Sequence, residues 1–192
     1  MIAILKYNAG NSTSVENAVN RLGYETRITD DISVLQAADK VIFPGVGEAS
    51  TAMNYLKAKG LDDVIKSLKQ PVLGICLGMQ LLCQSSEEGD TEALGIFTAN
   101  VLKFPPKNLV PHIGWNNLIE IKGKLFSGVT AQNDFYFVHS YYAEICEETI
   151  AINDYILPFS AALQKDNFYA TQFHPEKSAQ PGIQILKNFL NL

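Results

Sequence analysis

The segment Gly-Ile-Cys-Leu-Gly at positions 74–78 constrains the fold of this chain more than any other feature. It directly follows the apolar residues Pro-Val-Leu at 71–73 and directly precedes a stretch with a helical pattern at 79–83. A strand, a Gly-x-nucleophile-x-Gly turn and a helix together form a nucleophile elbow, where small flanking residues let the strand and the helix approach. Cys76 would then stand at a helix N-terminus, whose partial positive charge favours a thiolate. The segment predicts attack on a carbonyl carbon.

A structural interpretation of Cys76 competes with this one, because most free cysteines are small, buried, inert residues. A second segment favours catalysis. Residues 168–173 have the pattern of a strand that ends at His174-Pro175-Glu176. A histidine leaving a strand end, with a carboxylate two residues later, supplies a base and the group that orients it. Alone, His174 would be interpreted as a turn histidine before a proline; beside an elbow, His174 and Glu176 are candidate catalytic residues.

Composition limits the number of domains, the classes of binding partner and the cellular compartment. A chain of 192 residues with 47% hydrophobic content suits one domain over residues 1–192 with a substantial core. The net charge of −5 argues against nonspecific binding to nucleic acid or to anionic membranes. Three cysteines form no CxxC and no metal-ligand pattern, and their odd number suggests a reducing compartment. No leader pattern or apolar membrane-spanning stretch is found, so we expect a soluble cytoplasmic protein without a metal or a cofactor.

The first half of the chain alternates short apolar strands with amphipathic helices. Strands are predicted over 2–7, 26–29, 40–43 and 72–75, and helices over 49–59 and 62–68. A further helix, capped by Ser12 or Thr13, carries apolar residues at helical spacing and ends near Gly23. Repeated βα units of this kind indicate an α/β fold with a mostly parallel central sheet flanked by helices.

The second half is richer in strands and less regular. Residues 95–121 are strand-like but broken by two prolines, and residues 111–116 (Pro-His-Ile-Gly-Trp-Asn) are predicted to form a turn-rich insert. We expect an aromatic strand over 135–142, two short strands within 150–163 and a closing amphipathic helix around 183–190. No repeat or long linker divides the chain.

A second glycine-rich turn, Pro-Gly-Val-Gly at 44–47, follows the predicted strand that ends at Phe43. Loops at the carboxyl ends of parallel strands lie on the face where such folds bind ligands. Glycines there let backbone N–H groups point at a developing negative charge, so Val46 and Gly47 are candidates for an oxyanion hole. The second donor would be the N–H of Leu77, directly after the nucleophile. A phosphate-binding loop is the poorer alternative, because no Gly-Lys-Ser/Thr follows.

These landmarks resemble the class I (triad) glutamine amidotransferases over essentially the whole chain: Cys76 in GICLGMQ, His174 and Glu176 in FHPEKS, and the PGVG turn. Residues 6–11 and 111–116 are further similar to the glutaminase subunits of imidazole glycerol phosphate synthases. Sister domains of anthranilate and GMP synthases usually carry PGGP and CLGHQ where this chain has PGVG and CLGMQ. The opening departs slightly, since relatives often have an acidic residue near Tyr7. The resemblance implies an α/β fold with flavodoxin-like layering.

The resemblance also implies a reaction, the hydrolysis of L-glutamine to glutamate and ammonia. Cys76 would attack the amide carbon, and His174, oriented by Glu176, would protonate the leaving ammonia and then activate water. By the same resemblance, five residues help to bind glutamine: Gly47, Gln80, Glu88, Ser140 and Tyr141. From the residues alone, Gln80 is equally a helix-surface glutamine, and Ser140 and Tyr141 are ordinary strand residues.

The implied partner is a (β/α)8-barrel cyclase subunit, which would form a heterodimer with this chain and use the ammonia in histidine biosynthesis. That subunit converts an open-chain aminoimidazole ribonucleotide (PRFAR) to imidazole glycerol phosphate and AICAR. The resemblance places Asn11, His112, Trp115 and Lys177 at the interface. Trp115, the single tryptophan, is equally well interpreted as a core anchor. His139 has a structural interpretation too, as a strand histidine bonded to the backbone.

Two other classes of function remain open. The same elbow serves stand-alone cysteine hydrolases and DJ-1-like protective proteins, and a docking module in which Cys76 is merely packed is a third possibility. Neither explains why the PGVG turn, Cys76, His174 and Glu176 occur together. The Gly-Val-Gly composition further suggests a gated site, in which one peptide N–H of the turn points away from the oxyanion until the partner binds its ligand.

Overall fold

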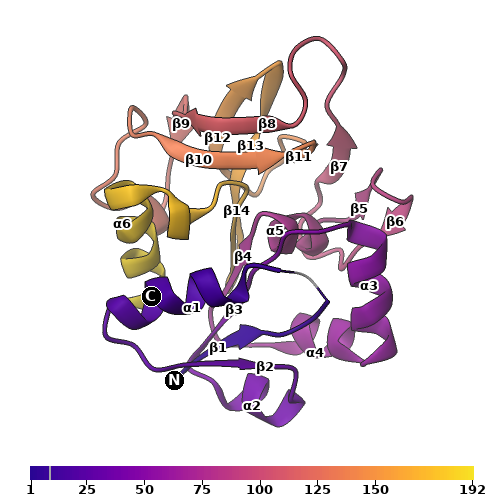
Figure 1. The fold of residues 1–192 in the computed structure, drawn as a ribbon, viewed down its shortest axis with the longest axis vertical. Coiled ribbons are helices and arrows are strands. Elements are labelled where there is room, and N and C mark those ends of the chain that lie inside the picture. The colour runs from indigo at the N-terminus through magenta and orange to yellow at the C-terminus, as the bar shows by residue number, and fades with distance from the viewer. Residues whose placement is uncertain (9) are drawn as a thin grey trace.

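The computed structural model describes residues 1–8 and 10–192, and among these one mixed sheet contains twelve strands (Figure 1). Ala9, within the resemblance segment 6–11, lies outside the described residues. The parallel part of the sheet has the order β2 (Thr26–Thr29), β1 (Ile2–Leu5), β3 (Lys40–Phe43), β4 (Val72–Ile75) and β14 (Phe168–Thr171). The predicted α/β fold with a mostly parallel central sheet is confirmed.

Helices cover both faces of these strands. They are α1 (Ser12–Arg21), α2 (Ile32–Ala37), α3 (Ala49–Ala58), α4 (Leu61–Ser67), α5 (Leu77–Leu82) and α6 (Ala179–Leu190), with 3-10 turns η1 (Lys124–Phe126) and η2 (Pro175–Lys177). Alternate residues of a strand face opposite sides. Ile4 therefore packs in the core beneath α1 and α6, whereas Ala3 and Leu5 pack in the core beneath α2 to α5. Figure 1 shows α1 and α6 on one side of the parallel strands and α3 and α4 on the other.

The start of α1 differs from the prediction. The cap position is held by Asn11, not by Ser12 or Thr13, and its side chain makes no capping hydrogen bond. Asn11 has a left-handed backbone (φ 77°), and its side chain turns instead toward Glu176. The end of α1 is as predicted, because Gly23 has a φ of 87° and donates its N–H to Asn20 O at 2.9 Å.

The helix α2 was not predicted. It is only six residues long and buries a single side chain, Leu35, so it carries no apolar periodicity. Its start is set locally, since the Asp31 carboxylate accepts the N–H groups of Ser33 and Val34.

Residues 85–165 add nine strands, whose pairings are antiparallel except for that of β5 with β7. They are β5 (Ser85–Ser86), β6 (Thr91–Glu92), β7 (Asn100–Lys103), β8 (His112–Asn116), β9 (Glu120–Ile121), β10 (Phe135–His139), β11 (Tyr141–Ala143), β12 (Thr149–Tyr155) and β13 (Leu157–Lys165). β13 pairs with β14 and thereby extends the parallel sheet. The prediction of an additional strand-rich segment is confirmed, although β12 and β13 are longer than expected.

Two predictions about this half were wrong. Residues 112–116 are strand β8, which pairs with β10 in a separate two-stranded sheet, rather than a turn-rich insert. The single strand expected over 135–142 is two strands interrupted at Ser140, because β10 pairs with β8 whereas β11 pairs with β7. The partners of these strands are remote in sequence, so local composition does not show the pairing.

Across the described parts of the chain, no helix is long and apolar enough to cross a membrane. Three segments leave the parallel sheet at one edge: the turn after β3, the elbow after β4 and the segment after β14. Because carboxyl ends of parallel strands meet at one edge, these segments converge there. The sheet thereby assembles the predicted landmarks at one place.

Candidate active site

Cys76 occupies the turn between β4 and α5 in a strained backbone conformation, with φ 52° and ψ −107°. Its N–H donates to Thr171 O at 2.8 Å, which fixes the turn against β14. The flanking glycines are required by contact: a Cβ on Gly74 would lie 3.0 Å from the Gly78 backbone, and one on Gly78 would lie 1.8 Å from Phe43 O. The sequence therefore folds locally into the nucleophile elbow that its spacing predicts.

His174 follows β14 and is completely buried. Its Nδ1 lies 2.8 Å from Glu176 Oε1, and the Glu176 side chain is also fully buried. Asn11 Nδ2 donates to the same carboxylate oxygen. The other ring nitrogen, His174 Nε2, has no hydrogen-bond partner among the described residues. The ring is thus oriented from one side by Glu176, while Nε2 is left for the reaction.

The charge state of His174 suits a cysteine-based site. Burial lowers the pKa of His174, but the negative charge of Cys76 and the hydrogen bond to Glu176 more than offset that effect and raise it to about 10. His174 is therefore an imidazolium at neutral pH. A positively charged imidazolium beside a cysteine favours the thiolate, which is the nucleophilic form.

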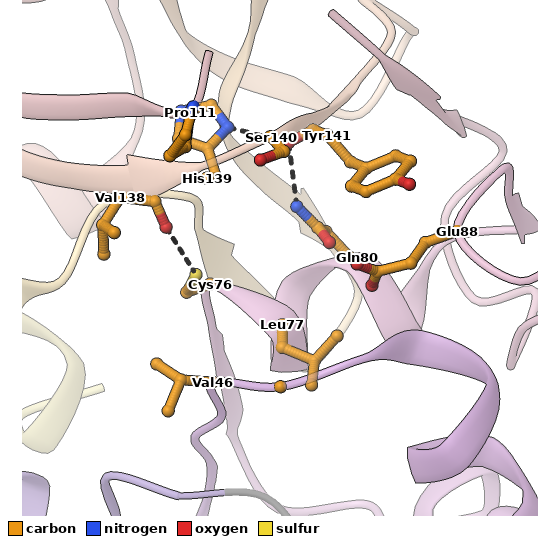
Figure 2. A pocket seen from close by; sticks show the side chains of 11 residues that line it. Val46, Cys76, Leu77, Gln80, Glu88, Pro111, Val138, His139, Ser140 and Tyr141 are labelled. Atoms are coloured by element: carbon orange, nitrogen blue, oxygen red, sulfur yellow. Dashed lines mark hydrogen bonds between the residues drawn. The ribbon is translucent and has the colours of Figure 1, made fainter.

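A cavity of about 270 Å³ opens beside Cys76 (Figure 2). Cys76 and Leu77 line it. So do all five residues predicted to bind substrate, which are Gly47, Gln80, Glu88, Ser140 and Tyr141. Figure 2 shows Gln80 between Cys76 and Glu88 and below Ser140 and Tyr141, with Gln80 hydrogen-bonded to the carbonyl of Tyr141. The cavity is thus bounded by the elbow helix, the PGVG turn and the end of β10.

Glu88 is the acidic group of this cavity. Its Oε2 accepts the N–H of Ala49 at 2.9 Å, at the start of α3. Partial burial raises the pKa of Glu88, the hydrogen bond from Ala49 opposes that effect, and the neighbouring Glu48 adds to it. A carboxylate held in this way is suited to bind an ammonium group.

The predicted oxyanion donors are not all free in this structure. The N–H of Leu77 donates to Gly45 O at 3.3 Å. The turn that carries this carbonyl is tightly held, because Tyr7 Oη donates to Pro44 O at 2.6 Å and a Cβ on Gly45 would lie 2.0 Å from Tyr7 Oη. Tyr7 is therefore a buried packing residue of the turn.

Comparison with known proteins identifies the family. The chain matches the family model described as glutamine amidotransferase class-I over residues 4–192. The chain belongs to this family. It is 59% identical to the imidazole glycerol phosphate synthase subunit HisH of Bacteroides thetaiotaomicron over 194 residues, covering 100% of this chain and 99% of that protein. It is 46% identical to the HisH protein of Colwellia psychrerythraea, covering 98% of this chain and 92% of that protein. Within the class I glutamine amidotransferases, the chain therefore belongs to the HisH group.

Solved structures show the same fold at low sequence identity. A putative GMP synthase component from Thermoplasma acidophilum superposes with a TM-score of 0.75 at 22% identity, covering 100% of this chain and 92% of that one. PurLQS from Thermotoga maritima superposes with a TM-score of 0.74 at 15% identity, covering 99% and 97%. The glutamine amidotransferase fold thus accommodates the whole chain.

The residues predicted to contact a partner lie in different surroundings. Trp115 on β8 is 55% exposed, so its interpretation as a core anchor was wrong. Its ring packs edge-on against Tyr136 with centroids 5.9 Å apart, and Lys177 Nζ lies 5.9 Å from the centroid of the same Tyr136 ring. Trp115, Tyr136 and Lys177 therefore form one surface cluster in this glutamine amidotransferase.

Of the other two residues of that prediction, Asn11 contacts the triad and His112 is buried beside His139. His112 is only 4% exposed, and its Nδ1 lies 3.1 Å from His139 Nε2. His139 Nδ1 in turn contacts Tyr141 O at 2.7 Å, as its structural interpretation expects. Asn11 bonds to Glu176. Of these, His112 offers little side-chain surface to a partner.

One residue of the site was missed in the sequence. Gln172 is fully buried, and its Nε2 lies 3.6 Å from Cys76 Sγ. A signal for it exists: Gln172 stands two residues before His174, and residues two apart in extended chain face the same side. A buried amide at that spacing would point toward the same centre as the base.

Proposed function

We propose that this class I glutamine amidotransferase is the glutaminase subunit of an imidazole glycerol phosphate synthase and works through Cys76, His174 and Glu176. It hydrolyses L-glutamine and delivers the ammonia to a (β/α)8-barrel cyclase subunit in a heterodimer, which converts PRFAR to imidazole glycerol phosphate and AICAR in histidine biosynthesis. The chain acts as a single domain of residues 1–192 in the cytoplasm. The observation that supports the proposal most is the buried, Glu176-bonded His174 beside the elbow cysteine at the edge of a cavity.

The reaction follows from the positions of these groups. Glutamine binds with its carboxamide over Cys76, and the thiolate adds to the amide carbon. His174 gives its proton to the leaving nitrogen, so that ammonia departs and a glutamyl thioester remains. The neutral His174 then takes a proton from water, whose oxygen attacks the thioester and releases glutamate. Glu176 holds the ring in place through both steps.

Substrate selection is assigned to the polar groups of the cavity. Glu88 is the group for the α-ammonium of glutamine, because it is the cavity's carboxylate. Gln80, which lies beside Glu88, and the segment between β10 and β11 at Ser140 and Tyr141 supply further hydrogen-bonding groups. The five residues together would distinguish glutamine from a simple amide.

The occupied Leu77 N–H supports a gated site. While it donates to Gly45 O, it is not available to an oxyanion. A shift of the turn at Val46 and Gly47 would remove that carbonyl and bring one of the turn's own N–H groups toward the substrate. Losing one oxyanion donor typically lowers the rate by about 10²–10³-fold. We therefore expect low activity in the isolated chain and strong activation by the liganded partner.

The test is the release of glutamate from glutamine by the pure chain, and then by the chain mixed with a barrel cyclase and its nucleotide ligand. Low basal activity, strong stimulation by the liganded cyclase and no activity in Cys76→Ala are the expected results. Activity that is indifferent to the cyclase would favour a stand-alone hydrolase and remove the histidine-pathway assignment. No activity under any condition would contradict the catalytic role of Cys76.

A further inference from the structure

Gln172 is a buried side chain that the proposed reaction does not use. It follows β14 directly and has no exposed surface. Burying an amide costs free energy unless its polar atoms are hydrogen-bonded. Both ends of this amide are engaged: Oε1 accepts from Gln80 Nε2 at 2.9 Å, and Nε2 lies 3.6 Å from Cys76 Sγ. Gln172 therefore joins a residue of the substrate cavity to the nucleophile.

The orientation of both amides follows from one backbone group. The Tyr141 carbonyl only accepts hydrogen bonds, so the Gln80 atom 3.0 Å from it is the nitrogen. That same nitrogen contacts Gln172, whose nearer atom must then be the accepting oxygen. The remaining end of Gln172, facing the sulfur, is consequently the NH₂ group. The Tyr141 carbonyl on β11 thus fixes the orientation of both amides, and the Gln172 NH₂ group is the donor that faces Cys76 Sγ.

This donor matters because the sulfur has an opposing neighbour. Val138 O lies 3.9 Å from Cys76 Sγ, where it accepts from a thiol but repels a thiolate. An N–H group at Gln172 Nε2 has the reverse preference, since a thiolate accepts hydrogen bonds more strongly than a thiol. The balance between these two contacts therefore affects the relative stability of the thiol and thiolate forms of Cys76.

The same bonds orient Gln80. Both N–H groups of its amide are used inside the protein, by Tyr141 O and by Gln172 Oε1. Gln80 lines the cavity, so its Oε1 is the polar atom left for a ligand. Without Gln172, one N–H would lose its partner, and the bond to Tyr141 O alone would hold the amide.

We propose that Gln172 is a positioning residue with two separable roles: its Nε2 donates to the Cys76 thiolate, and its Oε1 holds Gln80 with an acceptor facing the substrate. The second role rests on the proposed glutaminase function, whereas the first does not require glutamine at all. The amide chain from Tyr141 O through Gln80 and Gln172 to Cys76 is the structural basis of both.

Two substitutions separate the roles. Gln172→Glu keeps the Oε1 acceptor for Gln80 but replaces the donor at the sulfur by an oxygen. Gln172→Met keeps a similar length and removes both bonds. Gln164→Glu, a partly buried position on β13 outside the cavity, is the control for the chemical change itself.

The first measurement is the rate of Cys76 alkylation by iodoacetamide as a function of pH, with the modified cysteine identified by mass spectrometry. Both Gln172 variants should alkylate at least about tenfold more slowly at neutral pH, because each lacks the hydrogen bond that stabilises the thiolate. At alkaline pH, where the thiol is deprotonated in any case, their rates should approach that of the wild type. Gln164→Glu should keep the wild-type profile.

The second measurement is glutaminase activity in the presence of the liganded cyclase. Gln172→Glu should lower kcat with little change in KM, whereas Gln172→Met should lower kcat and raise KM. Folded variants, verified by thermal melting, that alkylate with the wild-type pH profile would overturn the thiolate role. An unchanged KM in Gln172→Met would overturn the Gln80 role. If wild-type protein shows no glutaminase activity but the alkylation profiles still shift, the proposed function fails while the thiolate role stands.

Discussion

Cys76 has a backbone conformation that non-glycine residues rarely adopt, and glycines stand two residues away on each side because a Cβ at either position would clash. A positive φ of 52° costs a cysteine about 1–2 kcal/mol relative to an ordinary conformation. Packing against Phe43 and the bond from the Cys76 N–H to Thr171 O hold the turn in place. Strain of this kind persists where the surrounding structure over-determines the conformation.

Gly78→Ala is expected to destabilise the protein by several kcal/mol, because its Cβ would lie 1.8 Å from Phe43 O, a backbone atom that has no room to move. Gly23→Ala is the control, since a Cβ at this position meets no atom within 4 Å. Its cost should be only about 1 kcal/mol, from the left-handed φ. Urea unfolding of both variants tests this; equal losses would contradict the packing argument.

The pKa of His174 depends on its neighbour. Because the negative charge of Cys76 raises that pKa and burial lowers it, Cys76→Ala should lower the pKa of His174 from about 10. Titration of the imidazole resonances by NMR in wild type and variant measures the difference. An unchanged pKa would mean that Glu176 alone keeps the ring charged.

At the scale of elements, the two-stranded sheet of β8 and β10 has one face buried in the protein and one face toward solvent. Their register places His112 opposite His139 on the buried side, where the His112 ring stacks on Tyr155 with centroids 3.9 Å apart. Trp115 lies opposite Tyr136, and the Trp115 side chain is exposed to solvent. The alternation of the strand therefore decides which of these residues faces the interior and which faces the surface.

The buried histidines predict acid sensitivity. Burial lowers the pKa of His112 to about 4 and that of His139 to about 3, below the usual value of 6.5. The unfolded chain binds these protons first, so the contribution of these two histidines to the free energy of unfolding should be constant above pH 6.5 and fall as the pH drops from 6.5 toward 3. His112→Phe keeps the ring packing and should remove roughly 2 kcal/mol of this fall. Chemical unfolding across pH measures it; a slope equal to the wild type would contradict the prediction.

The exposed cluster predicts the partner interface. Trp115→Ala should weaken binding to the cyclase by more than about tenfold while changing the free energy of unfolding by less than about 0.5 kcal/mol, because Trp115 is exposed in the free chain. Titration calorimetry gives the affinity. Ile145→Ala, an exposed apolar residue outside the cluster, is the control. Equal affinities for wild type and Trp115→Ala would place the interface elsewhere.

At the scale of the whole molecule, one sheet edge collects residues from remote parts of the sequence. The turn after β3, the elbow after β4 and the segment after β14 belong to adjacent parallel strands, so Gly47, Cys76 and His174 converge although they are far apart in the chain. The cavity is completed by β10 and β11, which the antiparallel half places against the elbow. Both halves of the chain are therefore needed for one site.

The local sequence determined those features that depend on short spacing. The elbow follows from two glycines around Cys76, the alternation of strands and helices from apolar periodicity, and the candidate triad from a histidine and a carboxylate two residues apart. These patterns are encoded within a few residues, so they can be found without knowing what each element packs against.

Only the tertiary structure decided the features that depend on remote partners. It made residues 112–116 a strand rather than a turn by pairing them with β10, and it turned Asn11 toward Glu176 rather than into a helix cap. It placed Gly45 O on the Leu77 N–H and Gln172 between Gln80 and Cys76. The physical reason is common to all four: a backbone or side-chain polar group bonds to whichever partner the fold brings within about 3 Å, and that partner is set by strand order and register rather than by neighbours in the sequence.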